Sequence, residues 1–325
     1  MVITSLIAGT DQMDRRSFFG TGFSGLAFAN VNTGPQSMNA PVVVEREEGG
    51  QPRRGKVLTA IQPHADDIPL FAAGTVAKLI DEGATGYLIR ITNDDKTGPG
   101  TVGEGVKNNE ADNYAVSKAL GCRKVYDFNY RNHNLDEASS VELRGRLIFL
   151  FRLLQADIVI CYDPWSLYEE NPDHYMTARA VEGACWMAGM SKDYPEHLDA
   201  GIKPHAVTER YYFARGPQLV NRVVDITSTV ERKIDSLLVN QTQGPAGTKG
   251  AELRASLAEK GLKLPLLGND DRTANREYIR QFILVRDAEA GREFNLKYAE
   301  RFHYVGPPDT SDVLNYVRQH AVPLK

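Results

Sequence analysis

Two short clusters of His, Asp and Asn side chains carry the residue types that hydrolytic metal chemistry needs. The first is Pro63-His64-Ala65-Asp66-Asp67, and the second is Asn171-Pro172-Asp173-His174. His64 and one Asp of the first cluster could bind a divalent metal, and the other Asp could act on a metal-bound water. Catalytic zinc usually has three protein ligands and one open position, so His174 is the natural third ligand.

Strand-to-helix crossings are predicted to position both clusters. The apolar, partly β-branched run Val57–Ile61 indicates a buried strand that ends at the first cluster, and Pro69 suits the first turn of a helix running to Ile80. Asp157–Tyr162 indicates the strongest strand of the chain and precedes the second cluster, which opens a helix over Tyr175–Met187. Since parallel strands end at the same edge of a sheet, we expect the two clusters to meet there.

The remaining pattern alternates strands with helices up to about residue 240. Strands are predicted at Thr85–Thr92, Val125–Phe128, Glu209–Ala214 and Val223–Ile226, and helices at Lys107–Leu120, Val141–Gln155, Ser228–Asn240, Ala251–Lys260, Asn275–Ala290 and Phe294–Phe302. This alternation predicts an α/β fold: a Rossmann-like three-layer sandwich with a mostly parallel sheet and a metal site at the carboxyl ends of the strands. We expect a linker over residues 30–55, a core over 56–243 and a C-terminal extension over 244–325 that packs on the core.

Composition restricts the partners. The 325 residues carry a net charge of −4 and no stripe of Lys and Arg, which argues against nucleic acid. The longest apolar runs are too short for a membrane span. Three widely spaced cysteines, Cys122, Cys161 and Cys185, favour buried free thiols over a disulfide framework.

The first residues are typical of a targeting segment. Arg15 and Arg16 precede a mildly apolar run, Gly20–Ala29, which ends in small residues that resemble a cleavage site. Residues 1–29 therefore predict a twin-arginine signal peptide and export to the periplasm or beyond, or a cytoplasmic location if the signal is not used. Met13 is an alternative start, because residues 1–12 fit poorly as the basic part of such a signal.

The two clusters, in this order and in this context, resemble the motifs of the LmbE-like (PIG-L) family of zinc-dependent N-deacetylases. That family has a P/A-H-P-D-D-E box after its first strand and an H-P-D-H box after a later one. Supporting matches are Asp163-Pro164, Ala119-Leu120-Gly121 and Lys107 with Glu110-Ala111. The resemblance covers roughly residues 56–243.

The resemblance implies a role for each matching residue. His64, Asp67 and His174 would bind zinc or another divalent transition metal, Asp66 would be the general base on a zinc-activated water, and Asp173 would support the neighbouring catalytic group. The substrate would be a small N-acylated amino sugar of the N-acetylglucosamine type, or a glycoconjugate, cut to acetate and a free amine. The residues that we expect to contact it are Asp94, Lys107, Arg131, His133 and Tyr168.

Three positions depart from the family boxes. Ala65 replaces Pro, Ile68 replaces Glu, and Asn171 replaces the first His of H-P-D-H. Asn171 can donate a hydrogen bond to an oxyanion, but it is no acid at neutral pH. Either Asp66 carries the proton alone, or another residue takes the place of this His, for which Tyr168, His133 and His205 are the candidates, or the protein is only weakly active.

Two other functions therefore stay open from the sequence. One is a secreted carbohydrate-binding protein on a degenerate hydrolase scaffold. The other is an amidase that acts on a different amide, such as a thiol conjugate.

Overall fold

A computed structural model describes residues 41–307 and 311–323 of the chain. The signal peptide predicted for residues 1–29 lies outside the described residues, as does the first part of the linker predicted for 30–55. The described part of this linker contains a strand, β1 (Val43–Glu45), which pairs in parallel with β7 (Arg222–Asp225). Residues 43–45 therefore belong to the sheet and not to a linker.

The centre of the fold is a sheet of eight strands in the order β1-β7-β8-β6-β5-β2-β3-β4. All strand pairs are parallel except those that β8 makes with β6 and β7. The other strands are β2 (Val57–Gln62), β3 (Thr85–Thr92), β4 (Lys124–Tyr130), β5 (Ile158–Tyr162), β6 (Glu209–Phe213) and β8 (Ala299–Val305). The mostly parallel α/β sheet flanked by helices confirms the predicted fold class.

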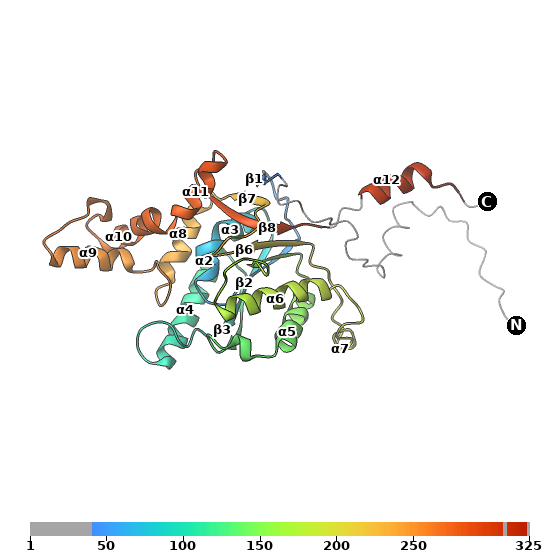
Figure 1. Cartoon of the computed structure of the whole chain (residues 1–325), viewed down its shortest axis with the longest axis horizontal. Helices are drawn as coiled ribbons and strands as arrows, with labels where there is room; N and C mark the ends of the chain where they lie inside the picture. The colour runs from blue at the N-terminus through green and yellow to red at the C-terminus, as the bar shows by residue number, and fades with distance from the viewer. Residues whose placement is uncertain (1–40, 308–310, 324–325) are drawn as a thin grey trace. The chain divides into compact units, whose positions relative to one another are not determined.

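Two sets of helices that pack on one another can be followed in Figure 1. In one group, α5 (Ser140–Leu154) packs on α6 (Pro172–Met187), and in the other α3 (Ala73–Asp81) and α4 (Val102–Leu120) pack on α8 (Val230–Val239). The remaining helices are α2 (Asp67–Phe71), α7 (Glu196–Asp199), α9 (Lys249–Glu259), α10 (Asp271–Tyr278), α11 (Val285–Glu293) and α12 (Ser311–His320). Short turns of helix occur at η1 (Leu135–Glu137), η2 (Pro265–Leu267) and η3 (Ile279–Ile283), of which η3 is a π-helix.

The strand order places a topological switch point between β2 and β5. From β2 the chain adds β3 and then β4 on one side, and it later adds β5 and β6 on the other side. Helices that leave neighbouring strands in opposite directions open a crevice between their first turns, where ligands bind in open α/β sheets. Both strands are buried, since every residue of β5 and all but the first of β2 are shielded from solvent.

Several predicted boundaries change, each for a local or tertiary reason. The helix predicted from Pro69 to Ile80 is two helices, α2 and α3, because the backbone leaves the helical region at Ala72. Helix α4 begins at Val102, five residues before the predicted start at Lys107. Thr101 and Glu104 form a capping box there, a signal present in the sequence.

One prediction of secondary structure is wrong. The segment Phe294–Phe302, predicted to be helical, instead leads into β8, which pairs antiparallel with β6 and β7. Since β8 lies between these two strands, the C-terminal region contributes to the sheet itself. The helix predicted over Asn275–Ala290 is divided among α10, η3 and α11.

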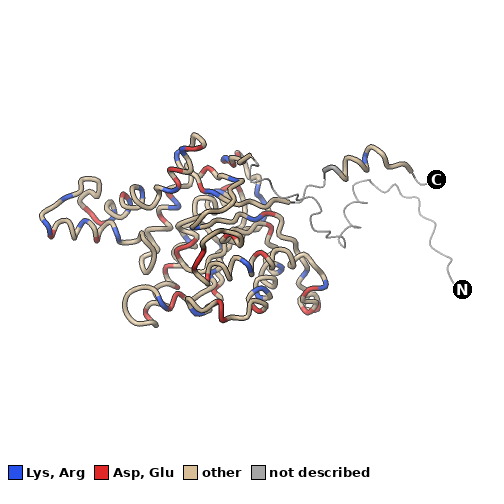
Figure 2. Tube along the Cα trace, viewed as in Figure 1, with Lys and Arg blue, Asp and Glu red and all other residues tan. Residues whose placement is uncertain are grey.

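Basic and acidic residues alternate along the described part of the chain, as Figure 2 shows. No helix among residues 41–307 and 311–323 is long and apolar enough to cross a membrane. The three cysteines are free thiols, and Cys161 and Cys185 are buried, as predicted.

Candidate active site

The two sequence clusters meet at the switch point between β2 and β5. His64 follows β2, Asp67 opens α2, and His174 lies in the first turn of α6, which follows β5. One ligand atom from each of the three residues lies within 4.8 Å of the others, and all three residues are buried. A lone imidazole or carboxylate is costly to bury, so this convergence indicates a site for a cation.

The spacing of the donor atoms fits a transition metal. His64 Nδ1 lies 3.1 Å from His174 Nε2, and each of these nitrogens lies 3.5 Å from an Asp67 oxygen. Bonds of 2.0–2.1 Å to a tetrahedral zinc place two ligand atoms about 3.4 Å apart, close to these three separations. Two imidazoles and a carboxylate also suit other divalent transition metals, so the donor set fits a metal ion without selecting zinc.

Hydrogen bonds hold Asp67 in place. Its Oδ2 accepts the backbone N–H of His64 (2.9 Å), and its Oδ1 accepts the hydroxyl of Tyr162 at the end of β5 (2.7 Å). Burial would raise the pKa of Asp67, but His174 and His64 more than offset it and lower that pKa to about 2. The carboxylate therefore stays ionised, as a metal ligand must.

His64 is surrounded by carboxylates. Its Nε2 lies 3.0 Å from Asp173 Oδ2, and its Nδ1 faces His174 and Asp67. Burial lowers the pKa of His64, yet the bonds to Asp173 and Asp67 raise it well above its usual value. The site thus favours positive charge at this point, which a bound cation would supply.

Asp66 has a different environment from Asp67. It lines a cavity of about 220 Å³ beside the three ligand atoms, and its carboxylate has no side-chain partner among the described residues. Burial and the neighbouring Asp67 raise the pKa of Asp66 to about 7. The pKa values of the two adjacent carboxylates, Asp66 and Asp67, therefore differ widely. Such a difference is expected where one carboxylate binds a metal and its neighbour gains and loses a proton.

Asp173 and Asn171 complete the start of α6. Asp173 is fully buried and accepts the backbone N–H groups of His133 (2.6 Å) and Leu135 (3.1 Å) in addition to His64. Asn171 caps the helix, its Oδ1 accepting the N–H of Asp173 at 3.0 Å. Asn171 also lines the cavity. Because the cap uses its Oδ1, the Nδ2 hydrogens of Asn171 are available to a ligand.

The five residues predicted to contact substrate differ in their position relative to the cavity. Of the five, His133 lines the cavity. Asp94 is buried beneath the first cluster, where it accepts hydrogen bonds from Arg90 and from the backbone of Ala65. The other three, Lys107, Arg131 and Tyr168, are exposed and are not among the lining residues.

Two positions connected with the departures lie away from the cavity. His205 was a candidate for the missing His, but it lies 3.5 Å from Asp157, just before β5 begins, and so at the opposite end of that strand from the site. Ile68 points into the hydrophobic core with no exposed area. Its side chain therefore packs in the core and leaves the cavity wall to other residues.

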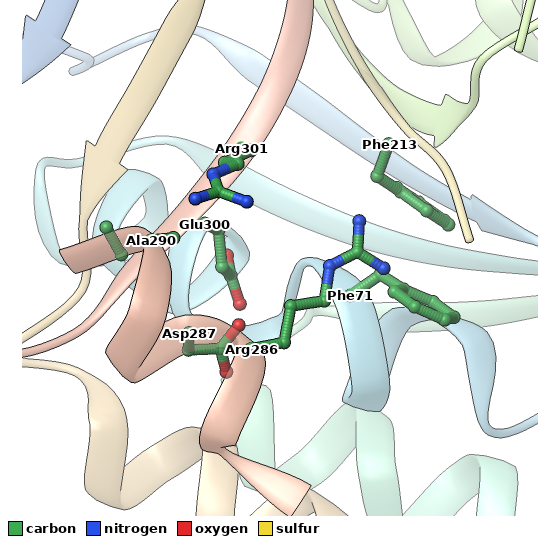
Figure 3. Close-up of a pocket in the computed structure, with 8 residues that line it drawn as sticks. Phe71, Phe213, Arg286, Asp287, Ala290, Glu300 and Arg301 are labelled. Carbon is green, nitrogen blue, oxygen red and sulfur yellow. The ribbon is translucent and has the colours of Figure 1, made fainter. Parts of the chain in front are cut away.

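Several lining residues carried no recognisable signal in the sequence. They are Leu70, Phe71, Thr97, Asn132, Tyr162 and Arg215. Behind the wall, Phe71 stacks on Phe213 with ring centroids 5.5 Å apart, and the Arg286 guanidinium lies 5.2 Å from the Phe71 ring (Figure 3). These contacts tie α2, which carries Asp67, to β6 and α11, so the C-terminal region supports the site.

Gly244 lies next to Asp66. Its φ of +88° is a conformation that suits glycine, and a Cβ at this position would lie 3.2 Å from both Cβ and Oδ2 of Asp66. Nearby, Asn240 donates a hydrogen bond to the carbonyl of Ala65 at 2.8 Å. The segment after α8 therefore shapes the surroundings of Asp66.

Comparison with known protein families agrees with the family resemblance of the two sequence clusters. Residues 59–185, which contain both, match the family described as PIG-L: GlcNAc-PI de-N-acetylase. The chain therefore carries a domain of the PIG-L (LmbE-like) family, whose hydrolases act on N-acetyl amide bonds, and the predicted family and enzyme class are confirmed.

The chain is also similar to individual proteins and solved structures. A diacetylchitobiose deacetylase from Thermococcus kodakarensis is 26% identical over 197 residues, which cover 58% of this chain and 71% of the relative. The structure of N,N'-diacetylchitobiose deacetylase from Pyrococcus horikoshii matches with a TM-score of 0.62 at 23% identity, covering 83% of this chain and 88% of the other. GalB, a 4-carboxy-2-hydroxymuconate hydratase from Pseudomonas putida, matches with a TM-score of 0.55 at 17% identity over 79% and 98% of the chains. Because a protein named as a hydratase shares this fold, function must be argued from the site.

Proposed function

We propose that the protein is a metal-dependent N-deacetylase that removes the acetyl group from an N-acetylglucosamine-type sugar. The observation that carries the proposal is the buried His64, Asp67 and His174 set with the unpaired carboxylate of Asp66 beside it in one cavity. The family match and the relatives named as diacetylchitobiose deacetylases support the sugar class.

The cavity limits what can enter. Its volume of about 220 Å³ is below the roughly 300–1,000 Å³ of sites for drug-sized ligands, which suits one monosaccharide unit. Its wall combines Leu70 and Phe71 with polar groups such as Asn132 and Gln243, as sugars with one apolar face and many hydroxyls require. A longer glycoconjugate would place its other units outside the cavity.

His64, Asp67 and His174 would hold the metal. When bound, a zinc ion or a similar divalent metal would lower the pKa of a water molecule and polarise the substrate carbonyl. Asp66 then accepts the proton of the attacking water on its free carboxylate and returns it to the leaving amine. Asn171 Nδ2 donates a hydrogen bond to the carbonyl oxygen as negative charge develops there.

Proton transfer is the step for which the missing His matters most. Asn171 cannot supply a proton, so in this proposal Asp66 serves as base and then as acid. Among the residues considered as replacements for that His, His133 lines the cavity, whereas Tyr168 and His205 do not. His133→Gln therefore tests whether a second proton carrier takes part.

Amine release from a panel of acetylated compounds tests the proposal. The full chain, supplied with zinc, would be incubated with N-acetylglucosamine, diacetylchitobiose, an acetylated thiol conjugate and acetyl-lysine. We expect free amine from the sugars, and Asp66→Asn should lower turnover about 10²–10⁴-fold while keeping about one metal per chain. His174→Ala should lose the metal.

Asp136→Asn is the matched control, because Asp136 is exposed and lies outside the cavity lining. It should behave like the wild type in both metal content and turnover. A metal-loaded wild type that releases no amine from any sugar would contradict the proposed reaction. Release from the thiol conjugate alone would replace the sugar by another amide.

A further inference from the structure

The His174 ring has polar neighbours at both of its nitrogens. Its Nε2 faces His64 and Asp67 in the cavity, while its Nδ1 lies 3.1 Å from Oε1 of Glu169. Glu169 belongs to the loop between β5 and α6, and its side chain is only 6% exposed. A carboxylate is thus buried against the nitrogen of His174 that points away from the cavity.

Hydrogen bonds from Arg215 and from the backbone of Asn171 hold the Glu169 carboxylate. Arg215, which follows β6, donates to both carboxylate oxygens, from Nη2 to Oε1 at 2.5 Å and from Nε to Oε2 at 3.1 Å. Oε1 also accepts the backbone N–H of Asn171 at 3.1 Å. A two-pronged Arg–carboxylate pair fixes orientation as well as charge, so Glu169 has little freedom to turn away from His174.

The same arrangement occurs at the other imidazole. His64 faces the cavity with Nδ1, and its Nε2 lies 3.0 Å from Asp173. Each imidazole therefore has one nitrogen toward the cavity and one toward a buried carboxylate. A carboxylate in this position keeps the proton on the outer nitrogen, which leaves the inner nitrogen free to bind a metal and makes it more basic.

We propose that Glu169, held by Arg215, is a positioning residue that orients His174 and fixes its tautomer for metal binding. The inference rests on the proposed function, because it requires that His174 be a metal ligand. Glu169 contacts neither the cavity nor the reacting atoms, so its effect is exerted through His174. The loop between Asp163-Pro164 and the second box thus contributes a residue to the metal site.

Zinc affinity, measured by competition with a chelator, tests the inference separately from activity. Glu169→Gln keeps the size of the side chain but removes the charge. Loss of such an outer partner typically weakens metal binding by about 10–100-fold, and we expect a loss in this range. Glu170→Gln is the matched control, since the neighbouring Glu170 is exposed, and it should bind zinc like the wild type.

A second variant protects the test against misfolding. Arg215→Met keeps the Glu169 carboxylate and its hydrogen bond from the backbone of Asn171 but removes both hydrogen bonds from Arg215. It should weaken zinc binding by less than Glu169→Gln does. The visible absorption of the cobalt(II)-loaded proteins reports the ligand geometry, and circular dichroism of the metal-free proteins reports folding. If Glu169→Gln does not fold, the zinc affinity of Arg215→Met decides the matter.

The outcomes distinguish the inference from the proposed function. Zinc affinity of Glu169→Gln equal to that of the wild type, with an unchanged cobalt spectrum, would overturn the role of Glu169 and leave the deacetylase intact. A wild type that binds no zinc or cobalt would overturn both. Weak binding by Glu169→Gln beside normal binding by Glu170→Gln would support the inference.

Discussion

Replacing Lys233 by Met should destabilise the protein strongly, and more so at high pH. Lys233 in α8 has no exposed side-chain area, and its Nζ lies 2.7 Å from Asp287 in α11 and 2.8 Å from Glu300 in β8. Figure 3 shows the carboxylates of Asp287 and Glu300 near each other. Removing the cation would leave two buried negative charges together.

The partners of each carboxylate indicate where the cost arises. Glu300 also accepts the backbone N–H groups of Gly74 (3.0 Å) and Thr75 (2.8 Å), so it stays partly satisfied. Asp287 has no second hydrogen-bond donor among the described residues, although Arg286 lowers its pKa. Breaking a buried ion pair by removal of one partner costs about 3–5 kcal/mol, and we expect Lys233→Met to lie in this range at pH 8.

The pH dependence follows from Asp287. Burial raises the pKa of Asp287 to about 6 although Lys233 lowers it, so the pKa should rise further in Lys233→Met. A carboxyl group whose pKa is higher in the folded state than in the unfolded state contributes to stability while it is protonated. This contribution is complete below the unfolded pKa of about 3.9, and it is lost as the pH rises through the folded pKa. The difference between wild type and variant should therefore be small near pH 5 and largest near pH 8.

Urea unfolding of both proteins at pH 5 and pH 8 measures this difference. Lys249→Met is the control, because the Lys249–Glu252 pair is exposed and its loss should cost no more than about 1 kcal/mol. Adding Asp287→Asn to Lys233→Met should recover part of the stability at pH 8. A cost below 1 kcal/mol, or the same cost at both pH values, would refute the reasoning.

Two further predictions concern the walls of the site. Gly244→Ala should destabilise the fold by about 1–2 kcal/mol because of its positive φ, and it should lower turnover because the added Cβ would crowd Asp66. Gly103→Ala is the control and should be nearly neutral, since there is open space around Gly103. Equal melting temperatures and turnover for the two variants would contradict this prediction. Tyr162→Phe removes the hydroxyl that donates to Asp67 and should weaken metal binding about 10–100-fold in a chelator titration; unchanged affinity would show that Asp67 is fixed without it.

Local sequence determined the elements that carry the chemistry. The apolar strand runs before Pro63 and Asp163, and the polar residues after them, specify two strand-to-helix crossings without help from distant residues. Because the chain alternates strands and helices, a parallel sheet follows, and its strand ends bring His64 and His174 to one edge. This is why His64, Asp67 and His174, together with Asp66, could be predicted to lie as a group.

Tertiary structure decided the surroundings of that group. The sequence around Glu169 shows two adjacent glutamates, and only the position of Arg215 at the end of β6 selects the one that faces His174. Likewise, β8 is a strand because β6 and β7 offer it partners, although its segment was predicted to be helical. Side-chain and strand partners that are far apart in sequence leave no periodic pattern, so they become visible only when the chain is folded.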